Sequence, residues 1–368
     1  MSTVIVLGAG VCGLFAGLVL ARDGHDVTLL ERDPEPVPDA PEQAWEDWSR
    51  DGVVQFRQAH YIQPHGRAIL EQELPDVLEA LAAAGAVWFE PLDLMPPHIT
   101  DRRPRPGDER FRTLTARRPI IEQVLGSAAA SQPRLEVRRG VAVTGLAART
   151  YDGVPHVTGV RTDGGETLDG DLVVDATGRR SSLPRWLADI ASAPPYEEAE
   201  DSGFIYYTRF FRSSGAGMPQ FRAVPNAPVG TFSVLVLPGD NDTWSVTLYT
   251  SSGDRPLKRL RERERFDAVL SACPLHAQWL EGEAISEVLP MGGVVDRYRR
   301  LMVDGRPLVT GLALLADAWA CTNPSLGRGI ALGLRHASHL RDVVRRALDE
   351  PRELAAAWDA ATETHLTP

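Results

Sequence analysis

Three glycines near the start of the chain have the spacing of a phosphate-binding turn. Gly8, Gly10 and Gly13 fit the pattern G-x-G-x-x-G within the stretch VIVLGAGVCGLF. The first glycine permits a tight turn, the second lets the backbone approach a pyrophosphate, and the third lets a helix lie close to a strand. The N–H groups at the start of that helix attract an anion. The pattern therefore predicts a dinucleotide in contact with these glycines and with Val11 and Cys12.

The glycines lie between segments that favour this interpretation. Residues 4–7 are apolar and β-branched, as in a buried parallel strand, 11–22 have helical spacing, and 26–31 resemble a second strand. Glu31, about twenty residues further on, would hydrogen-bond a ribose hydroxyl and repel a 2′-phosphate, which argues against NADP here. Arg32 is predicted to be a neighbouring contact. The alternative for the glycine pattern is a purely structural turn.

The composition limits the classes of partner. The 368 residues, 43% hydrophobic and 24% charged, suit a soluble protein of one large or two interlocked domains. A net charge of −11 works against nucleic acid or an anionic membrane as the main partner. The three cysteines show no metal-ligand spacing, so we expect no metal site and a reduced, cytoplasmic protein. The N-terminal apolar run lacks a signal-peptide pattern, and Asp26 and the glycines interrupt any membrane-spanning helix, so no membrane insertion is expected.

The pattern of residue types changes twice along the chain. Residues 66–84 have helical spacing with Gly85 as a stop, and FRTLTARRPIIEQVL indicates a strand leading into a helix. From about 201 to 255, aromatic and β-branched runs separated by turns predict an antiparallel sheet. The stretch RPLVTGLALLADAW then returns to the pattern of the nucleotide-binding segment, and the residues after Gly329 have helical spacing. This order predicts an α/β fold in which a substrate-covering antiparallel sheet is inserted into a Rossmann-like domain.

Two further segments carry a family resemblance. ARRPIIEQVL resembles the R-x-x-L-E-x-x-L segment of FAD-dependent aromatic hydroxylases, with Arg118, Ile121, Glu122 and Leu125 at the matching positions. LVTGLALLADAWACTNPSLGRGIALGLRHA resembles their second FAD signature, a strand ending in Gly-Asp followed by a loop with proline and glycine and then a helix. Nearly the whole chain thus resembles the flavoprotein monooxygenase superfamily with the p-hydroxybenzoate hydroxylase fold, nearest to its epoxidase and hydroxylase branch of bacterial secondary metabolism.

The resemblance implies FAD as the cofactor and assigns residues to it. Asp317 would hydrogen-bond the ribityl chain, and Pro324 would lie beside the isoalloxazine ring. The backbone of Gly327, Arg328 and Gly329, at a helix N-terminus, would face the flavin N1 and C2 carbonyl region, where negative charge develops on reduction. Further expected cofactor contacts are Arg118, Val143, Thr177 and Gly178. The alternative for Arg118 is an ordinary surface arginine.

Two departures from the family pattern matter. Ala316 replaces the glycine that usually precedes Asp317. In DLVVDATGRRSSLPRW, Thr177 stands where the hydroxylases that bind NAD(P)H themselves carry an aspartate, and Pro184 replaces their arginine. The reductant is therefore expected to be NADH or NADPH, used directly or through a separate flavin reductase.

The activity that the resemblance implies is that of an FAD-dependent monooxygenase. Such an enzyme passes one oxygen atom of O2, through a flavin C4a-hydroperoxide, to a small organic substrate by hydroxylation or epoxidation. The cofactor carries the difficult chemistry, so no dedicated acid or base is required. The aromatic runs 204–211 and 244–249 are predicted to form the wall that faces the substrate. The candidate pocket residues are His60, Tyr207, Arg209 and Pro324.

Other functions stay open, because the glycine segments identify the cofactor and not the reaction. One is an FAD-dependent reductase or dehydrogenase that never uses O2, and another is a non-catalytic flavin-binding protein. Flavin halogenases share the fold but carry an active-site lysine and a W-x-W-x-x-I stretch. Lys258, the single lysine of the chain, is far in sequence from the expected position, so halogenation is disfavoured.

Together these patterns predict a discontinuous FAD-binding domain, an inserted substrate domain and a helical tail. The FAD-binding domain is predicted to take residues 1–85, 111–185 and 290–350, the substrate domain 86–110 and 186–289, and the C-terminal tail 351–368. The tail ends without a cap at HLTP, as the end of a truncated chain would.

Overall fold

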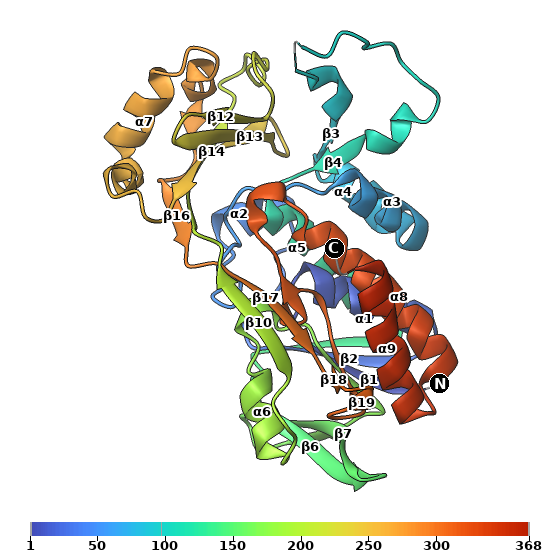
Figure 1. Cartoon of the computed structure of the whole chain (residues 1–368). Helices are drawn as coiled ribbons and strands as arrows, with labels where there is room; N and C mark the ends of the chain where they lie inside the picture. Colours follow the sequence, from blue (N-terminus) through green and yellow to red (C-terminus); the bar gives the residue numbers. More distant parts are fainter. Residues whose placement is uncertain (1, 97, 367–368) are drawn as a thin grey trace.

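A five-stranded parallel sheet forms the centre of the computed structural model, which describes residues 2–96 and 98–366 (Figure 1). Its strands run in the order β5 (Leu135–Arg139), β2 (Asp26–Glu31), β1 (Thr3–Leu7), β9 (Leu172–Asp175) and β20 (Leu312–Leu314). The predicted strands at 4–7 and 26–31 are confirmed. Following the chain, β2 and β5 are added on one side of β1, and β9 and β20 are then added on its other side. The strand order therefore reverses between β1 and β9. Open α/β sheets bind ligands at such a reversal.

Both faces of the parallel sheet are covered, because successive side chains of a strand point to opposite sides. In β1, Val4 and Val6 pack into a core shared with the helices, whereas Ile5 and Leu7 pack into a core shared with an antiparallel sheet. The helical layer contains α1 (Val11–Arg22), α5 (Arg118–Ser131), α8 (Gly329–Ala347) and α9 (Pro351–His365), and the other layer contains β6 (Val143–Tyr151), β7 (Val154–Thr162), β8 (Thr167–Asp169) and α6 (Leu183–Asp189). Burial on both faces explains why VIVL has no polar residue.

A second, antiparallel sheet lies at one end of the molecule and confirms the predicted insertion (Figure 1). Its elements are β11 (Phe204–Arg212), β12 (Asn226–Val229), β13 (Phe232–Pro238), β14 (Thr243–Ser251), β15 (Glu283–Ala284) and β16 (Leu289–Gly292), with α7 (Arg263–Ser271) against one face. A ladder of β10 (Tyr196–Asp201), β17 (Val295–Arg300) and β21 (Ala320–Cys321) links this sheet to the parallel one. The α/β class with an inserted antiparallel sheet is therefore the observed fold.

One local prediction needs correction. The helix predicted over 66–84 is two helices, α3 (Pro64–Glu73) and α4 (Pro75–Ala83), because Pro75 has no N–H to donate and its ring blocks the preceding turn. Gly85 follows α4 with φ of +93°, as its predicted role as a stop requires. The proline-rich segment after β2 also contains the short helix α2 (Pro41–Glu46), which begins at a proline in the position that helices tolerate.

The remaining elements are short. They are β3 (Val87–Phe89), β4 (Thr113–Thr115), β18 (Met302–Val303), β19 (Arg306–Pro307) and the 3-10 turns η1 (Pro91–Leu94), η2 (Asp108–Phe111), η3 (Gly178–Arg180), η4 (Pro256–Arg261), η5 (Ala277–Leu280), η6 (Ala316–Ala318) and η7 (Pro324–Leu326). The domain limits stay a prediction. Residues 1, 97 and 367–368, which those limits include, lie outside the described residues.

Candidate functional site

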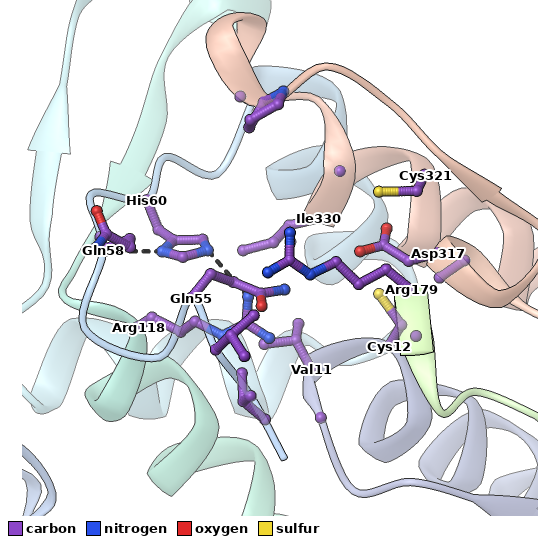
Figure 2. A pocket seen from close by; sticks show the side chains of 18 of the residues that line it. Val11, Cys12, Gln55, Gln58, His60, Arg118, Arg179, Asp317, Cys321 and Ile330 are labelled. Carbon is purple, nitrogen blue, oxygen red and sulfur yellow. Dashed lines mark hydrogen bonds between the residues drawn. The ribbon is translucent and has the colours of Figure 1, made fainter. Parts of the chain in front are cut away.

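A cavity of about 760 Å³ opens at the carboxyl ends of β1, β2 and β9, where the strand order reverses. One half is lined by the turns that follow these strands, the start of α5 and the loop 316–329. The other half is lined by residues from 89–96, β13 and β16. Figure 2 shows the middle of the cavity, where side chains from separate segments surround a common space. The cavity thus joins the two sheets of the molecule.

All but one of the predicted cofactor contacts line this cavity. They are Gly8, Gly10, Val11, Cys12, Gly13, Glu31, Arg32, Arg118, Val143, Thr177, Gly178, Asp317, Pro324, Gly327 and Gly329. Arg328 is exposed and lines a neighbouring cavity of about 910 Å³, which shares Asp317 and Gly329 with the first. The segments that sequence patterns assigned to one cofactor therefore meet in one place.

The glycine turn has the geometry that each position requires. Gly8 has φ of +95°, and a Cβ there would lie 2.8 Å from the carbonyl oxygen of Ala176. A Cβ on Gly13 would lie 1.9 Å from the carbonyl oxygen of Gly8, so only glycine lets α1 approach the turn. Around Gly10 the nearest atom to a Cβ would be Nη2 of Arg118, at 3.9 Å, which leaves the backbone open to the cavity. These are the roles of a pyrophosphate-binding turn.

Glu31 is held at the end of β2 by a buried arginine. Its carboxylate accepts hydrogen bonds from the N–H of Ala9 at 2.8 Å, from Arg50 at 2.6 Å and from the N–H of Asp33 at 3.0 Å. Arg50 also pairs with Asp33 at 3.1 Å and with Glu122 at 2.7 Å, and its side chain has no solvent exposure. The carboxylate predicted to meet the ribose is therefore fixed in position at the cavity wall.

Arg118 and His60 form a second fixed pair at the wall. Arg118 donates from Nε to Glu122 at 2.7 Å, and its Nη1 lies 2.9 Å from Nε2 of His60 (Figure 2). Because arginine can only donate, His60 accepts at Nε2 and donates from Nδ1 to the carbonyl oxygen of Gln58, 2.9 Å away. Burial, followed by the charge of Arg118, lowers the pKa of His60 to about 3. His60 is therefore neutral near pH 7 and positions Arg118.

Asp317 lies in the middle of the cavity beside Arg179 and two thiols (Figure 2). Burial raises the pKa of Asp317, while the positive charges of Arg118 and Arg179 act in the opposite direction. Burial and the nearby Asp317 raise the pKa values of Cys12 and Cys321 to about 12. The thiols of Cys12 and Cys321 are thus uncharged and contribute packing only. The polar side chains here are Asp317 and Arg179.

The loop before Asp317 tolerates alanine in place of the family glycine at a conformational cost. Ala316 has φ of +52°, in the left-handed region that favours glycine. Its N–H donates to Nδ1 of His336 in α8 at 3.0 Å. One turn before His336, a Cβ at Gly333 would lie 2.2 Å from Sγ of Cys12, so this glycine lets α8 cross α1 closely. The loop thus keeps the conformation that a glycine would favour, and Ala316 adopts it with an unfavourable positive φ.

Thr177, the unusual residue before Gly178, is used internally. Asp175 is fully buried and accepts hydrogen bonds from the N–H and hydroxyl of Thr177, at 3.0 and 2.6 Å, and from the hydroxyl of Ser181 at 2.5 Å. These bonds shape the turn between β9 and α6. The hydroxyl of Thr177 consequently points toward Asp175 and serves to hold the turn.

The charged residues lining the cavity are mainly basic. They are Arg32, Arg118, Arg179 and Arg180 against Glu31 and Asp317. This excess of positive charge suits the two negative charges of a dinucleotide pyrophosphate.

Tyr207 and Arg209 do not line the cavity, which corrects their selection as pocket residues. Tyr207 packs in the core under α7, and Arg209 pairs with Asp267 of α7 at 2.6 Å. Alternate residues of a strand face opposite sides of the sheet, and Tyr207 and Arg209 both lie on the face covered by α7, not on the face toward the cavity. The cavity wall comes instead from Leu235 and Leu237 of β13, together with β16, and not from the runs 204–211 and 244–249. His60 and Pro324 do line the cavity.

Several site residues were not selected from the sequence. Arg179 directly follows Gly178, and this adjacency was a usable signal. Gln55 and Arg50 come from an irregular segment between β2 and α3 that has no periodicity, so nothing in the sequence marked them. His336 lies inside α8, one of many positions with helical spacing.

A model of the FAD binding domain family matches residues 3–200, more than half of the chain, and the protein belongs to this family of FAD-binding proteins. Protein Rv3254 of Mycobacterium tuberculosis is 26% identical over 376 residues, covering 99% of this chain and 77% of that protein. The predicted FAD-binding character is therefore confirmed.

Solved structures of flavin enzymes share the fold. PqsL, a probable FAD-dependent monooxygenase from Pseudomonas aeruginosa, has a TM-score of 0.69 at 17% identity over 98% of this chain and 91% of its own. p-Nitrophenol 4-monooxygenase PnpA from Pseudomonas putida has a TM-score of 0.63 at 19% identity, over 95% and 82%. The flavin-dependent brominase Bmp2 has a TM-score of 0.66 at 15% identity, over 98% and 83%. The fold is thus that of the p-hydroxybenzoate hydroxylase-like flavin monooxygenases and halogenases.

The described part of the chain has neither a candidate metal site nor a candidate membrane-spanning helix. Residues 2–96 and 98–366 contain no group of three or more His, Cys, Asp or Glu side chains arranged to hold a metal ion. Within the same residues, every helix is too short or too polar to cross a membrane.

Proposed function

We propose that the protein is an FAD-dependent monooxygenase that transfers one oxygen atom of O2 to a small organic substrate by hydroxylation or epoxidation. The observation that carries the proposal is the continuity of the cavity. Its basic half lies at the glycine turn, and its apolar half lies between β13 and residues 89–96. A flavin that followed the first half would point its reactive ring toward the second half, and solved structures with this fold include monooxygenases.

The residues of this chain fit FAD. The open backbone at Gly10, the fixed carboxylate of Glu31 and the excess of arginines suit its adenosine and pyrophosphate. Asp317 would bind the ribityl chain, and the N-terminus of α8 at Gly329 would stabilise negative charge on the ring. When bound, FAD supplies the electron transfer and the activation of O2. The protein holds and shields it.

The apolar half would position the substrate and exclude water. Leu235, Leu237 and Met291 offer an apolar wall, and His60 stays neutral, so neither charge nor a titrating base faces the substrate there. Such an environment favours orientation and protects a reactive intermediate from hydrolysis.

The reductant is proposed to be NADH or NADPH, used directly or through a flavin reductase. The test reduces the FAD-loaded protein anaerobically with each nucleotide and follows the loss of flavin absorbance, with and without an added flavin reductase. Fast direct loss would refute the need for a partner. Loss only with the reductase would support it, and no reduction by any donor would favour a non-catalytic flavin-binding protein.

Oxygen uptake separates the monooxygenase from an FAD-dependent reductase or dehydrogenase. We expect uptake of O2 to match product formed, with ¹⁸O from labelled O2 in the product. Product formation under strict anaerobiosis would contradict the proposal. Halogenation is not proposed, because Lys258 is exposed in η4, away from the residues that line the cavity.

A further inference from the structure

We propose that the apolar half of the cavity takes an uncharged, largely apolar substrate and discriminates against carboxylates. The inference rests on the proposed function, because it assumes that the flavin ring faces this half. It goes further by naming the chemical class of the substrate.

Charge is divided unequally between the two halves. The lining residues from 89–96, 224–237 and 291–294 are apolar except for Asn226. Among the described residues, every charged residue that lines the cavity comes instead from the carboxyl ends of the parallel strands and the turns after them, from α5 or from the loop around Asp317. An anion in the apolar half would therefore have no cation of that half to pair with.

Two basic groups of the cavity, Arg118 and Arg179, each have a carboxylate beside them. Arg118 donates to Glu122 and to His60, as described above. Arg179 extends alongside Asp317 (Figure 2), and its positive charge opposes the rise in the pKa of that carboxyl that burial causes. Burial raises the pKa of Tyr61, which lines the cavity, to about 12, so its phenol is an uncharged hydrogen-bonding group at neutral pH. The polar contacts open to a substrate are thus neutral.

A buried carboxylate without a partner loses its hydration and gains nothing in exchange. The negative net charge of the protein adds a weaker repulsion at a distance. We expect an uncharged aromatic molecule to bind at least about tenfold more tightly than a carboxylate with the same ring system, since an unpaired charge costs more than the 1.4 kcal/mol that corresponds to tenfold.

The test compares 1-naphthol with 1-naphthoate on the FAD-loaded protein at neutral pH. Binding is measured as the change in flavin absorbance on titration, which needs no turnover. We expect saturable binding of naphthol and binding of naphthoate that is at least about tenfold weaker.

A substitution should reverse the preference. Leu235 is half-buried on the cavity side of β13, so an arginine there would place a cation in the apolar half. Leu235→Arg is expected to strengthen naphthoate binding about tenfold or more and to weaken naphthol binding. Leu235→Gln is the matched control, because it adds polarity without charge and should not favour naphthoate. Met291→Arg on β16 repeats the test from a second strand if the first variant retains no FAD.

Each outcome is decisive. Naphthoate that binds as tightly as naphthol, or an Arg179→Gln variant that selectively loses naphthoate, would overturn the inference by showing that a cation serves this half. Saturable binding of neither probe would also overturn it. A protein that cannot be loaded with FAD at all would instead contradict the proposed function.

Discussion

The imidazole of His336 accepts a hydrogen bond at Nδ1 from the backbone N–H of Ala316, 3.0 Å away, and so ties the loop that carries Asp317 to the middle of α8. The ring is almost completely buried and stacks on Trp358 with ring centroids 4.4 Å apart. Because Nδ1 accepts, the ring must be neutral with its proton on Nε2. The cofactor loop therefore depends on an uncharged histidine.

Acidification should destabilise the protein through His336. Burial lowers its pKa well below the ordinary 6.5, so between pH 7 and pH 5 the unfolded chain gains a proton that the folded chain does not. The contribution of His336 to stability should fall with pH over this window, by about 2 kcal/mol at pH 5. Urea unfolding at pH 7.5 and 5.0 measures it. His336→Asn, which keeps an acceptor for Ala316 but does not titrate, should lose less on acidification. Equal losses in both proteins would contradict the role of His336.

Ala316→Gly should stabilise the protein. Ala316 is in the left-handed region, with φ of +52°, where a Cβ costs about 1 kcal/mol. Glycine removes this cost but loses some entropy, so we expect a net gain of about 0.5 kcal/mol. Thermal unfolding measures it. Ala318→Gly, in the same turn but without a positive φ, is the control and should destabilise the protein. A loss of stability in Ala316→Gly would show that the backbone is not strained.

Arg50→Met should strongly destabilise the protein. Arg50 is the shared partner of Glu31, Asp33 and Glu122, and its loss would leave buried carboxylates unpaired. Glu122 would keep its pair with Arg118, but Glu31 and Asp33 would lose their arginine partner, and such losses cost about 3–5 kcal/mol. Arg22→Met is the control, because its pair with Asp76 is largely exposed and should contribute less than about 1 kcal/mol. Denaturant unfolding compares them, and similar small losses in both variants would contradict the role of Arg50.

Arg179→Gln should weaken FAD binding. Arg179 lines the cavity beside Asp317, where its charge would face the pyrophosphate or the flavin (Figure 2). Loss of a charge-assisted hydrogen bond of about 1.5–3 kcal/mol corresponds to an increase in Kd of about 10- to 100-fold. The midpoint potential of the bound flavin should also fall. Arg185→Gln, an exposed arginine of α6, is the control and should bind FAD normally. An unchanged Kd in Arg179→Gln would remove Arg179 from the site.

Sequence patterns anticipated the cofactor half of the site better than the substrate half. The glycine turn and Glu31 depend on local rules of spacing and backbone geometry, which a single segment contains. The Asp317 loop was assigned through its resemblance to the second FAD signature of the family. Tyr207 and Arg209 were placed on the wrong side, because every side chain of an aromatic strand looks similar until the opposite faces acquire different neighbours. Here α7 covers their face, and Leu235 and Leu237 face the cavity.

Local spacing was thus enough to predict a dinucleotide-binding α/β chain with an inserted antiparallel sheet, and the family resemblance of two further segments narrowed the cofactor to FAD. The selection of Arg50, Arg179 and His336, and the role of His60 beside Arg118, came only with tertiary structure, because each residue acts through partners distant in sequence. His60 is neutral because Arg118 and Gln58 meet it across separate segments, and Arg50 is an anchor because three carboxylates converge on it. Long-range packing decides such electrostatic environments, since burial and neighbouring charges set the protonation state of a group and no short stretch of sequence contains them.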